Sequence, residues 1–435
     1  MSEIKSIWSD TSHMPEFPRL EKDVKTDVLI IGGGIAGILT AYFLKQSGAD
    51  VILVEKGRIC SGTTRNTTAK ITFQHGLIYK KLTDSLGAGQ AGMYLEANRR
   101  AAEKYAELCR NMDCDYEVRD NYVYSVDNRA KLEEEILALD KIGYKAEFCE
   151  GLLPPIWTVG AVKFPNQAQF NPLKFLSFIS KELPIYENTF VREMIGNTAV
   201  TDKGKINADR VVVTTHFPFI NKHGAYFLKL YQHRSYFIAL ENAPDLDGMY
   251  VDEAKTGFSF RNYGNYLLIG GNGHRTGKKS DGWEKLRGFA GKYYPNLQEK
   301  YCWAAQDCMS LDGIPYIGRY SGNTKNLYVA SGFGKWGMTG SMTAAMLLSD
   351  MILGKQNDCA EIFDPSRSIL KPQLFANGFE ALKNLLTFTE KRCPHLGCAL
   401  KWNRAERSWD CPCHGSRFDE DGKVLDNPAN GDLKI

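Results

Sequence analysis

The sequence has almost no net charge and no long apolar segment. Its 435 residues include 54 Lys and Arg against 51 Asp and Glu, so the formal net charge is only +3 at pH 7. Because no long basic run accompanies this balance, the composition argues against a nucleic-acid-binding protein. The longest apolar run, Val28–Leu44, contains three consecutive glycines and is shorter than the roughly 20 residues of a membrane-spanning helix. The sequence therefore predicts no transmembrane segment.

The chain also lacks the sequence features of export, repetition and disorder. The opening decapeptide, MSEIKSIWSD, is polar and has no apolar signal-peptide core. No internal repeat or low-complexity stretch occurs. The hydrophobic fraction of 43% and the charged fraction of 24% are ordinary for a globular protein. We therefore expect a soluble, cytoplasmic protein of two or three domains at roughly 150 residues each.

Residues 26–56 predict a dinucleotide-binding unit of strand, glycine turn, helix and strand. Gly32, Gly34 and Gly37 fit G-x-G-x-x-G. The first glycine makes a tight turn, the second lets the backbone approach a pyrophosphate, and the third lets the helix lie close to the strand. Glu55 ends the second strand, where a carboxylate can bind a ribose diol. A purely structural βαβ turn is the alternative, and the agreement of all these features in one register disfavours it.

A second glycine cluster, Gly332, Gly334 and Gly337, also follows a strand and satisfies G-x-G-x-x-G. No strand ending in an acidic residue comes after it, so a second site, for NAD(P)H, is disfavoured. The N-terminus of the helix that begins there would still attract an anion.

Three segments resemble the D-amino-acid oxidase/glycine oxidase superfamily of FAD-dependent oxidoreductases. They are Gly32–Gly37 with Glu55, Leu311–Gly318 (LDGIPYIG), and the second glycine cluster in LYVASGFGKWGMTGS. The resemblance covers about residues 6–365. It implies FAD and hydride transfer from a C–N bond to the flavin. It also implies an α/β fold, with a Rossmann-type, glutathione-reductase-like FAD-binding domain and an antiparallel α+β substrate domain above the flavin.

The same resemblance implies domain boundaries and cofactor residues. The FAD-binding domain is expected over residues 1–80, 150–220 and 300–365, and the substrate domain over residues 81–149 and 221–299. The residues expected to bind FAD are Gly32, Gly34, Ile35, Ala36, Gly37, Glu55, Lys56, Gly62, Thr63, Thr64, Val191, Gly313, Gly334, Gly337, Met338 and Thr339.

Departures from the family pattern bear on the substrate. Asp307 replaces the arginine with which D-amino-acid dehydrogenases hold a substrate carboxylate, and Thr339 replaces the lysine that sarcosine oxidases use for this purpose. Asp307 would repel a carboxylate and attract an ammonium group. We therefore expect an amine or an amino-acid-like substrate, unless Asp307 lies outside the substrate site. The further candidates on the substrate side are Arg261, His274, Lys335, Tyr250 and Tyr263.

Two more departures concern oxygen and the attachment of the flavin. Leu268 stands where sarcosine oxidases have an oxygen-activating lysine. Ala305 stands close to where their flavin-tethering cysteine would fall. The resemblance therefore implies non-covalent FAD and poor oxidase activity, so that electrons need another exit.

The C-terminal tail has a metal-ligand pattern. Cys393 and His395 form C-x-H, and a second group, C-P-C-H, runs from Cys411 to His414. Cysteines clustered beside histidines indicate a metal site. Structural zinc is one alternative, but zinc ribbons favour C-x-x-C over a single residue between ligands. The pattern resembles the Rieske signature C-x-H…C-x-x-H, which implies a [2Fe-2S] cluster held by these two cysteines and two histidines.

The Rieske resemblance has three further implications. Cys398 and Cys413 match a pair that forms a disulfide in respiratory Rieske proteins, although a reducing cytosol disfavours that bond. Phe418 replaces a tyrosine that hydrogen-bonds a cluster cysteine in high-potential members, so we expect a lower reduction potential. The Rieske domain is expected over residues 373–435, after a linker at 364–372. The stretch before its first ligand looks helical, so an abbreviated all-β domain is expected.

Three functions remain open from the sequence. The first is an FAD-dependent dehydrogenase that oxidises an amine at a C–N bond and passes electrons through the cluster to an external protein or quinone. The second is a flavoprotein reductase that receives electrons through the cluster. The third is a non-enzymatic redox sensor.

Overall fold

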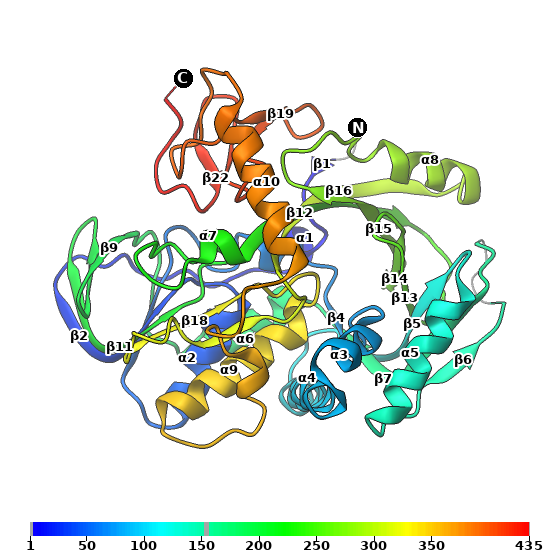
Figure 1. Cartoon of the computed structure of the whole chain (residues 1–435), viewed down its shortest axis with the longest axis horizontal. Helices are drawn as coiled ribbons and strands as arrows, with labels where there is room; N and C mark the ends of the chain where they lie inside the picture. Colours follow the sequence, from blue (N-terminus) through cyan, green and yellow to red (C-terminus); the bar gives the residue numbers. More distant parts are fainter. Residues whose placement is uncertain (1–2, 152–155, 435) are drawn as a thin grey trace.

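The computed structural model describes residues 3–151 and 156–434, which form three sheets and the helices that cover them. In Figure 1 a parallel sheet lies at the left and an antiparallel sheet curves down the right. The C-terminal tail lies above them. Among the described helices, none combines the length and the apolar character needed to cross a bilayer.

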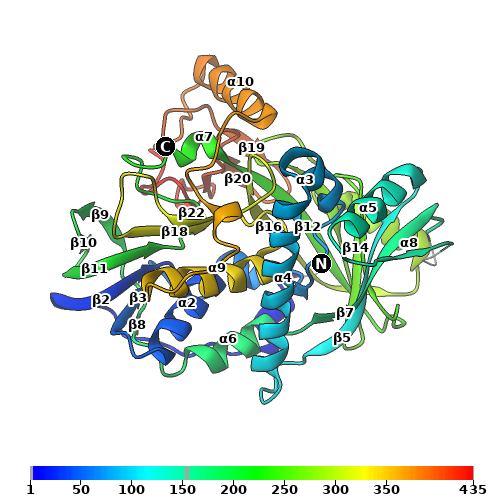
Figure 2. The same cartoon turned by 60° about the horizontal axis from the view of Figure 1, so that its bottom comes forward.

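The parallel sheet consists of apolar strands that are buried on both faces. Its order is β17-β18-β11-β2-β3-β8, and neighbours are parallel except for β17 and β18. Helices α2 and α9 pack together against it (Figure 2). Continuous apolar runs are typical of strands covered by helices on both sides. The elements are β2 (Val24–Ile31), α2 (Ile35–Gln46), β3 (Val51–Val54), β8 (Ile185–Tyr186), β9 (Val191–Ile195), β10 (Thr198–Thr201), β11 (Lys205–Val213), β17 (Tyr316–Arg319), β18 (Leu327–Ser331) and α9 (Gly337–Ile352).

The second sheet is mainly antiparallel, with the order β1-β16-β12-β15-β14-β13-β5-β7-β4 and with β6 paired to β7. Its strands are β1 (Glu3–Ile4), β4 (Lys70–Ile71), β5 (Glu117–Ser125), β6 (Glu147–Cys149), β7 (Gly160–Gln169), β12 (Leu230–Glu241), β13 (Met249–Asp252), β14 (Ser259–Tyr263), β15 (Tyr266–Arg275) and β16 (Gln298–Ser310). The helices around the two sheets are α1 (Trp8–Thr11), η1 (Thr63–Asn66), α3 (Ile78–Leu86), α4 (Ala88–Cys109), α5 (Arg129–Lys141), α6 (Pro172–Ser180), α7 (Tyr226–Lys229), α8 (Glu284–Tyr293) and η2 (Glu361–Phe363). The expected α/β fold with an antiparallel second domain is confirmed.

Three glycines, Gly270, Gly271 and Gly273, lie inside β15. The first is needed for packing, because a Cβ at Gly270 would lie 2.5 Å from the ring of Phe237 on β12. Glycine inside a strand marks such a close approach as often as a turn.

The two large sheets take their strands from segments that do not coincide with the expected domains. The segments 1–80, 150–220 and 300–365 were assigned to the FAD-binding domain, yet β1, β4, β7 and most of β16 belong to the antiparallel sheet. These strands pair with partners that are distant in sequence. The apolar pattern of a strand does not tell which of two sheets it joins.

The tail begins with helix α10 (Pro372–Leu386) and continues into a small antiparallel sheet. The sheet has the order β19-β20-β21-β22, with β19 (Lys401–Asn403), β20 (Ser408–Asp410), β21 (Arg417–Phe418) and β22 (Val424–Asp426). The helix ahead of Cys393 and the small all-β domain agree with the sequence.

A buried ion-pair network joins the tail to β12. The side chain of Arg234 donates from Nε to Glu406 Oε1 over 2.9 Å, and Arg417 Nη2 donates to Glu406 Oε2 over 2.8 Å. Arg417 also binds Asp410 and Asp426. The side chains of Arg234 and Glu406 are 7% and 10% exposed, so this contact is made away from water. Burial opposes ionisation, but the two arginines lower the pKa of Glu406 to about 2.

We predict that Glu406→Gln weakens the docking of the tail by about 3–5 kcal/mol, because two buried guanidinium groups would lose their shared counter-ion. Limited proteolysis and thermal unfolding followed by tail fluorescence measure the change. Since the pKa of Glu406 is lowered from its ordinary 4.5 to about 2, its contribution should be complete above pH 4.5 and be lost as the pH falls toward 2.

The exposed pair Arg407–Glu420 provides a matched control on the same tail. Glu420→Gln should change stability by less than about 1 kcal/mol. Equal effects of the two substitutions would contradict the assignment of docking to Glu406.

Candidate functional site

A cavity of about 1680 Å³ runs between the two large sheets and under the tail. Thirteen of the expected cofactor residues line it: Gly32, Gly34, Ile35, Ala36, Glu55, Lys56, Gly62, Thr63, Thr64, Val191, Gly334, Gly337 and Met338. Gly37, Gly313 and Thr339 were also expected to bind the cofactor, but they are not among the lining residues.

The first glycine turn forms one end of this cavity. Gly32 has φ +116°, and a Cβ there would lie 2.7 Å from the carbonyl oxygen of Thr214. A Cβ at Gly37 would lie 2.0 Å from the Gly32 carbonyl oxygen, so this glycine brings α2 against the turn instead of facing the cavity. Both positions therefore exclude larger residues, and the backbone around Gly34 stays open to a pyrophosphate.

Glu55 is held in place by the same turn. Its carboxylate accepts hydrogen bonds from Gly33 N over 2.8 Å and from Gly57 N over 3.0 Å. A carboxylate has about four acceptor positions, so it can still accept hydrogen bonds from a ribose diol. The glycine turn, the start of α2 and this carboxylate together fit the adenosine half of a dinucleotide.

The N-terminus of α9 faces another part of the cavity. Residues Phe333–Met338 line it, and the ring of Trp336 stacks on His75 with centroids 5.0 Å apart. Thr339 lies one position beyond this face and donates to Thr72 O over 2.9 Å, which explains why it is buried outside the cavity. The two ring nitrogens of His75 form hydrogen bonds with the hydroxyl groups of Tyr94 and Thr339. Burial lowers the pKa of His75 to about 3.

Three titratable groups meet on the wall that β12 and β16 contribute. His233 and Asp307 are opposite each other in the register of these strands, and Lys335 reaches the same region from the loop before α9. Burial raises the pKa of Asp307 to about 6, and Lys335 and Arg234 partly offset this rise. Burial is the main cause that lowers the pKa of His233 to about 3, and the positive charge of Lys335 is the next. The ring of His233 is therefore neutral. The sequence did not single out His233, because its position depends on the strand register.

Arg261 was a candidate for the substrate side, but it lies just behind the cavity wall. It is fully buried, donates from Nη1 to Ala69 O over 2.9 Å, and sits over the ring of Trp8. Burial lowers its pKa to about 9. The neighbouring Lys70 does line the cavity. Burial is the main cause that lowers the pKa of Lys70 to about 7, and the positive charge of Arg261 adds to the effect.

The other three candidates are not brought to the cavity. The ring of His274 stacks on Tyr236, on the side of β15 that faces the tail. Tyr250 stacks on Tyr122 and donates to a backbone carbonyl. Tyr263 donates its hydroxyl proton to Asp115 over 2.6 Å. None of the three is among the residues that line the cavity in the described part of the chain.

The ligand-bearing part of the tail consists of two loops with the same backbone pattern. In the first, Cys393 N donates to Cys398 O and Gly397 N donates to Cys393 O, each over 2.9 Å. In the second, Cys411 N donates to Ser416 O and Gly415 N donates to Cys411 O, again over 2.9 Å. Each loop closes through a glycine with positive φ. The loops therefore present their side chains to each other as two similar halves of one site.

The side chains between the loops suit two metal ions. Cys393 and Cys411 are buried at matching positions of the two loops, and the rings of His395 and His414 lie edge to face with centroids 5.0 Å apart. Nδ1 of both rings is buried without a hydrogen-bond partner. His414 Nε2 lies 3.1 Å from Phe227 O, an acceptor, so Nε2 carries the proton and Nδ1 keeps its free lone pair. Two cysteines and two available imidazole nitrogens fit the set expected for a [2Fe-2S] cluster.

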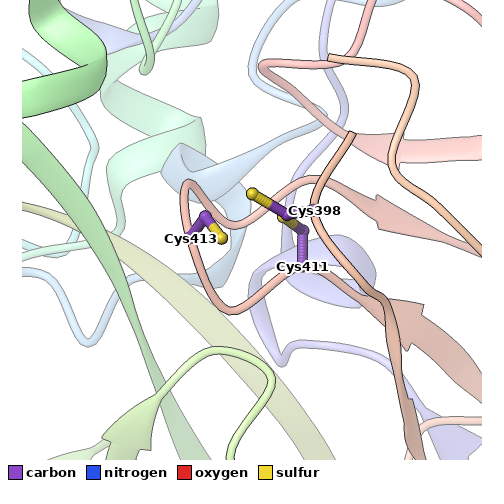
Figure 3. A group of neighbouring side chains, drawn as sticks. All are labelled: Cys398, Cys411 and Cys413. Carbon is purple, nitrogen blue, oxygen red and sulfur yellow. The ribbon is translucent and has the colours of Figure 1, made fainter. Parts of the chain in front are cut away.

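Cys398 and Cys413 lie beside this ligand set. Figure 3 shows them with Cys411 on the two facing loops, and the three sulfur atoms lie within 4.8 Å of one another. Both are free thiols in this structure, so the disulfide that the resemblance implied is absent between them.

The sequence gave no signal for the residues that join the two sites. The side chain of Gln306 donates from Nε2 to Gly415 O over 2.8 Å. The backbone carbonyl oxygen of Gln306 accepts a hydrogen bond from Thr63 Oγ1 over 3.3 Å. Gly415 also packs so closely on Gln232 that a Cβ would lie 2.1 Å from Gln232 Cγ. Only the pairing of β12 with β16 brings these glutamines under the second ligand loop.

Strand β12 contributes residues to both cofactor sites. Its residues Tyr231, His233, Arg234 and Ser235 line the cavity. Gln232 packs on Gly415 of the tail, and Arg234 binds Glu406, which also lines the cavity. One strand therefore borders both the cavity and the second ligand loop.

Comparison with known proteins yields two family matches. Residues 27–351 match the model of the FAD dependent oxidoreductase family DAO, and residues 374–435 match that of the Rieske [2Fe-2S] domain. YhfW of Bacillus subtilis (strain 168), whose name describes a Rieske 2Fe-2S iron-sulfur protein, is 33% identical over 99% of this chain and 97% of its own length. Both resemblances drawn from the sequence are thereby confirmed.

Solved structures share the fold of the larger part of the chain. L-proline dehydrogenase from P. horikoshii superposes with a TM-score of 0.67 at 18% identity, over 81% of this chain and 98% of that protein. Glycine oxidase from Geobacillus kaustophilus gives a TM-score of 0.66 at 20% identity, over 79% and 99%. At such low identity the likeness concerns the fold alone.

We predict that His414→Ala removes the iron and its visible absorption, because the cluster would lose one of its two expected imidazole ligands. Iron and acid-labile sulfide analysis, with EPR of the reduced protein, measures the loss. His223→Ala, at an exposed histidine, is the control and should leave both unchanged. Stoichiometric zinc without sulfide in the unsubstituted protein would contradict the cluster assignment.

Proposed function

We propose that this chain, which belongs to the DAO family of FAD-dependent oxidoreductases and ends in a Rieske [2Fe-2S] domain, is a dehydrogenase that oxidises an amine or amino-acid-like substrate at a C–N bond. We infer that its electrons leave through the cluster to an external acceptor. Oxidation of a neutral amine to an iminium ion gives FAD one hydride, that is two electrons and one proton, and a Rieske cluster carries electrons singly.

The observation that carries this proposal is the shared wall between the two sites. Gln306 contacts the second ligand loop with its side chain and the cavity residue Thr63 with its backbone. The tail also reaches the cavity itself, because Asn427 lines it and donates to Thr215 O over 2.7 Å. A redox domain held so close to the flavin cavity supports electron transfer within the chain.

The charges at the cavity wall support an amine as substrate. Asp307 faces the cavity, and the arginine of the amino-acid dehydrogenase pattern is absent from its position. The ionised carboxylate would bind a substrate ammonium group in a charge-assisted hydrogen bond and accept the proton that this group must lose before the neutral amine gives up its hydride. The neutral ring of His233 beside it can accept or donate a further hydrogen bond. Lys335 is then available for a polar group elsewhere on the substrate.

Anaerobic titration tests the direction of electron flow. We expect candidate amines to bleach the flavin first and the cluster afterwards, with little oxygen consumption in air. Reduction of both centres by a reduced ferredoxin, with no response to any amine, would support a reductase instead. A protein whose centres respond to neither donor would fit a redox sensor.

We predict that Gln306→Leu slows reduction of the cluster but not of the flavin, because it removes the hydrogen bond between β16 and the ligand loop. Stopped-flow absorbance during a single turnover separates the two steps. Gln298→Leu, at the exposed far end of the same strand, should affect neither. Equal rates in the Gln306 variant and the unsubstituted protein would remove the support for transfer through this wall.

We predict that Asp307→Asn raises KM for the amine about 10- to 100-fold, which corresponds to about 1.5–3 kcal/mol for a hydrogen bond to a charged group. Since burial raises the pKa of Asp307 to about 6, the carboxylate forms as the pH rises through 6. The kcat/KM of the unsubstituted enzyme should therefore increase over that range, and the variant should lack this increase.

The control for this pH profile is Asp209→Asn, at an exposed position on β11. It should keep both the KM and the pH dependence of the unsubstituted enzyme. An unchanged profile in the Asp307 variant would place this residue outside the substrate site.

A further inference from the structure

Helix α10 has the opposite polarity to an ordinary surface helix. Its buried residues are polar: Asn377, Glu380 and Asn384. Its large apolar residues face outward. The exposed fractions are 71% for Phe375, 70% for Phe379, 57% for Leu382 and 77% for Leu386. A surface helix normally buries its apolar stripe against the core, so the outward face of α10 needs a partner.

The inward polar residues fix this orientation. Arg275 Nη1 donates to Asn377 Oδ1 over 2.8 Å, and Lys278 Nζ donates to Glu380 Oε2 over 2.6 Å. At the end of the helix, Ala399 N donates to Asn384 O over 3.0 Å. Rotation of α10 to bury its phenylalanines would break all three contacts and leave polar groups without partners, which is costly.

Residues next to the helix extend the same surface. Leu370 before it and Phe388 after it are 76% and 101% exposed. We call these two, together with Phe375, Phe379, Leu382 and Leu386, the apolar face of α10. Leu396, which follows the expected iron ligand His395, is also exposed. In Figure 2 the helix projects at the upper edge of the molecule, away from both large sheets.

Basic residues accompany this face. Lys383 is exposed on the helix, and Arg392 is exposed just after it. Lys371 and Lys391 flank the two ends and are partly exposed. Glu390 is the one exposed acidic residue from 370 to 392, since Glu380 is buried in its ion pair. A convex apolar stripe with Leu and Phe, bordered by Lys and Arg, is the pattern of a helix that lies in a membrane interface and attracts anionic lipids.

We propose that the apolar face of α10 binds the surface of an anionic lipid membrane, with the helix lying in the plane of the interface. The charge around the face decides for lipid over a second copy of the chain, because two copies would bring the same positive residues together. The attachment does not depend on the proposed function. It places the loop Cys393–Cys398 on the side of the protein nearest the membrane, through Leu396.

Vesicle flotation of the full-length protein with its cofactors bound tests this proposal. We expect binding to vesicles of phosphatidylglycerol and phosphatidylcholine, weaker binding to phosphatidylcholine alone, and partial release at high salt. The double variant Phe379→Ser/Leu386→Ser should lower the partition coefficient at least about tenfold. Lys371→Gln/Lys383→Gln should lower only the anionic component. Phe178→Ser, at an exposed phenylalanine on α6, is the control and should bind as the unsubstituted protein does.

Flavin and iron content of each variant shows whether it is folded, independently of activity. Absence of binding to anionic vesicles would overturn the proposal, whatever the enzyme oxidises. A dimer in light scattering that becomes a monomer in the Phe379→Ser/Leu386→Ser variant, without vesicle binding, would assign the face to self-association instead. Equal binding to neutral and anionic vesicles would overturn the role given to the basic residues.

Discussion

The arrangement of this protein depends on one buried carboxylate, Glu406, that is shared between Arg234 of the antiparallel sheet and Arg417 of the tail. Two guanidinium groups that are removed from water require such a partner, and the tail satisfies them only in one position. The same position brings Gly415 onto Gln232 and Gln306. The docking contact therefore determines how close the expected cluster lies to the flavin cavity.

The antiparallel sheet serves two sites at once because β12 borders both of them. Four residues from Tyr231 to Ser235 line the cavity, and two of the same stretch, Gln232 and Arg234, contact the tail. The tail thus needs no long domain of its own, since the larger protein supplies one wall of its ligand site. His414 illustrates this, because its Nε2 donates to a carbonyl oxygen of Phe227, which belongs to α7 and not to the tail. The flavoprotein part of the chain therefore helps to orient an expected ligand of the cluster.

Sequence reasoning succeeded where function is encoded by neighbouring residues. The glycines around Gly32, the acid at Glu55 and the four expected cluster ligands were recognised from short spacings, and the structure brings each set together. It failed where position depends on strand pairing. His274 and Tyr250 were candidates because they lie on strands of the second sheet, yet neither is among the residues that line the cavity. A shift of one residue reverses the face of a strand, and no local pattern specifies that register.

By itself, the sequence determined the two families and their cofactors and predicted the loops that would hold them, because a glycine turn or a C-x-H loop is made by residues in immediate succession. Only the tertiary structure decided how these parts work on each other. It placed His233 opposite Asp307, set Gln306 between the two sites, and turned the apolar face of α10 outward. The physical reason is that these relations arise from contacts between segments up to hundreds of residues apart, whose pairing is selected by packing and burial over the whole chain.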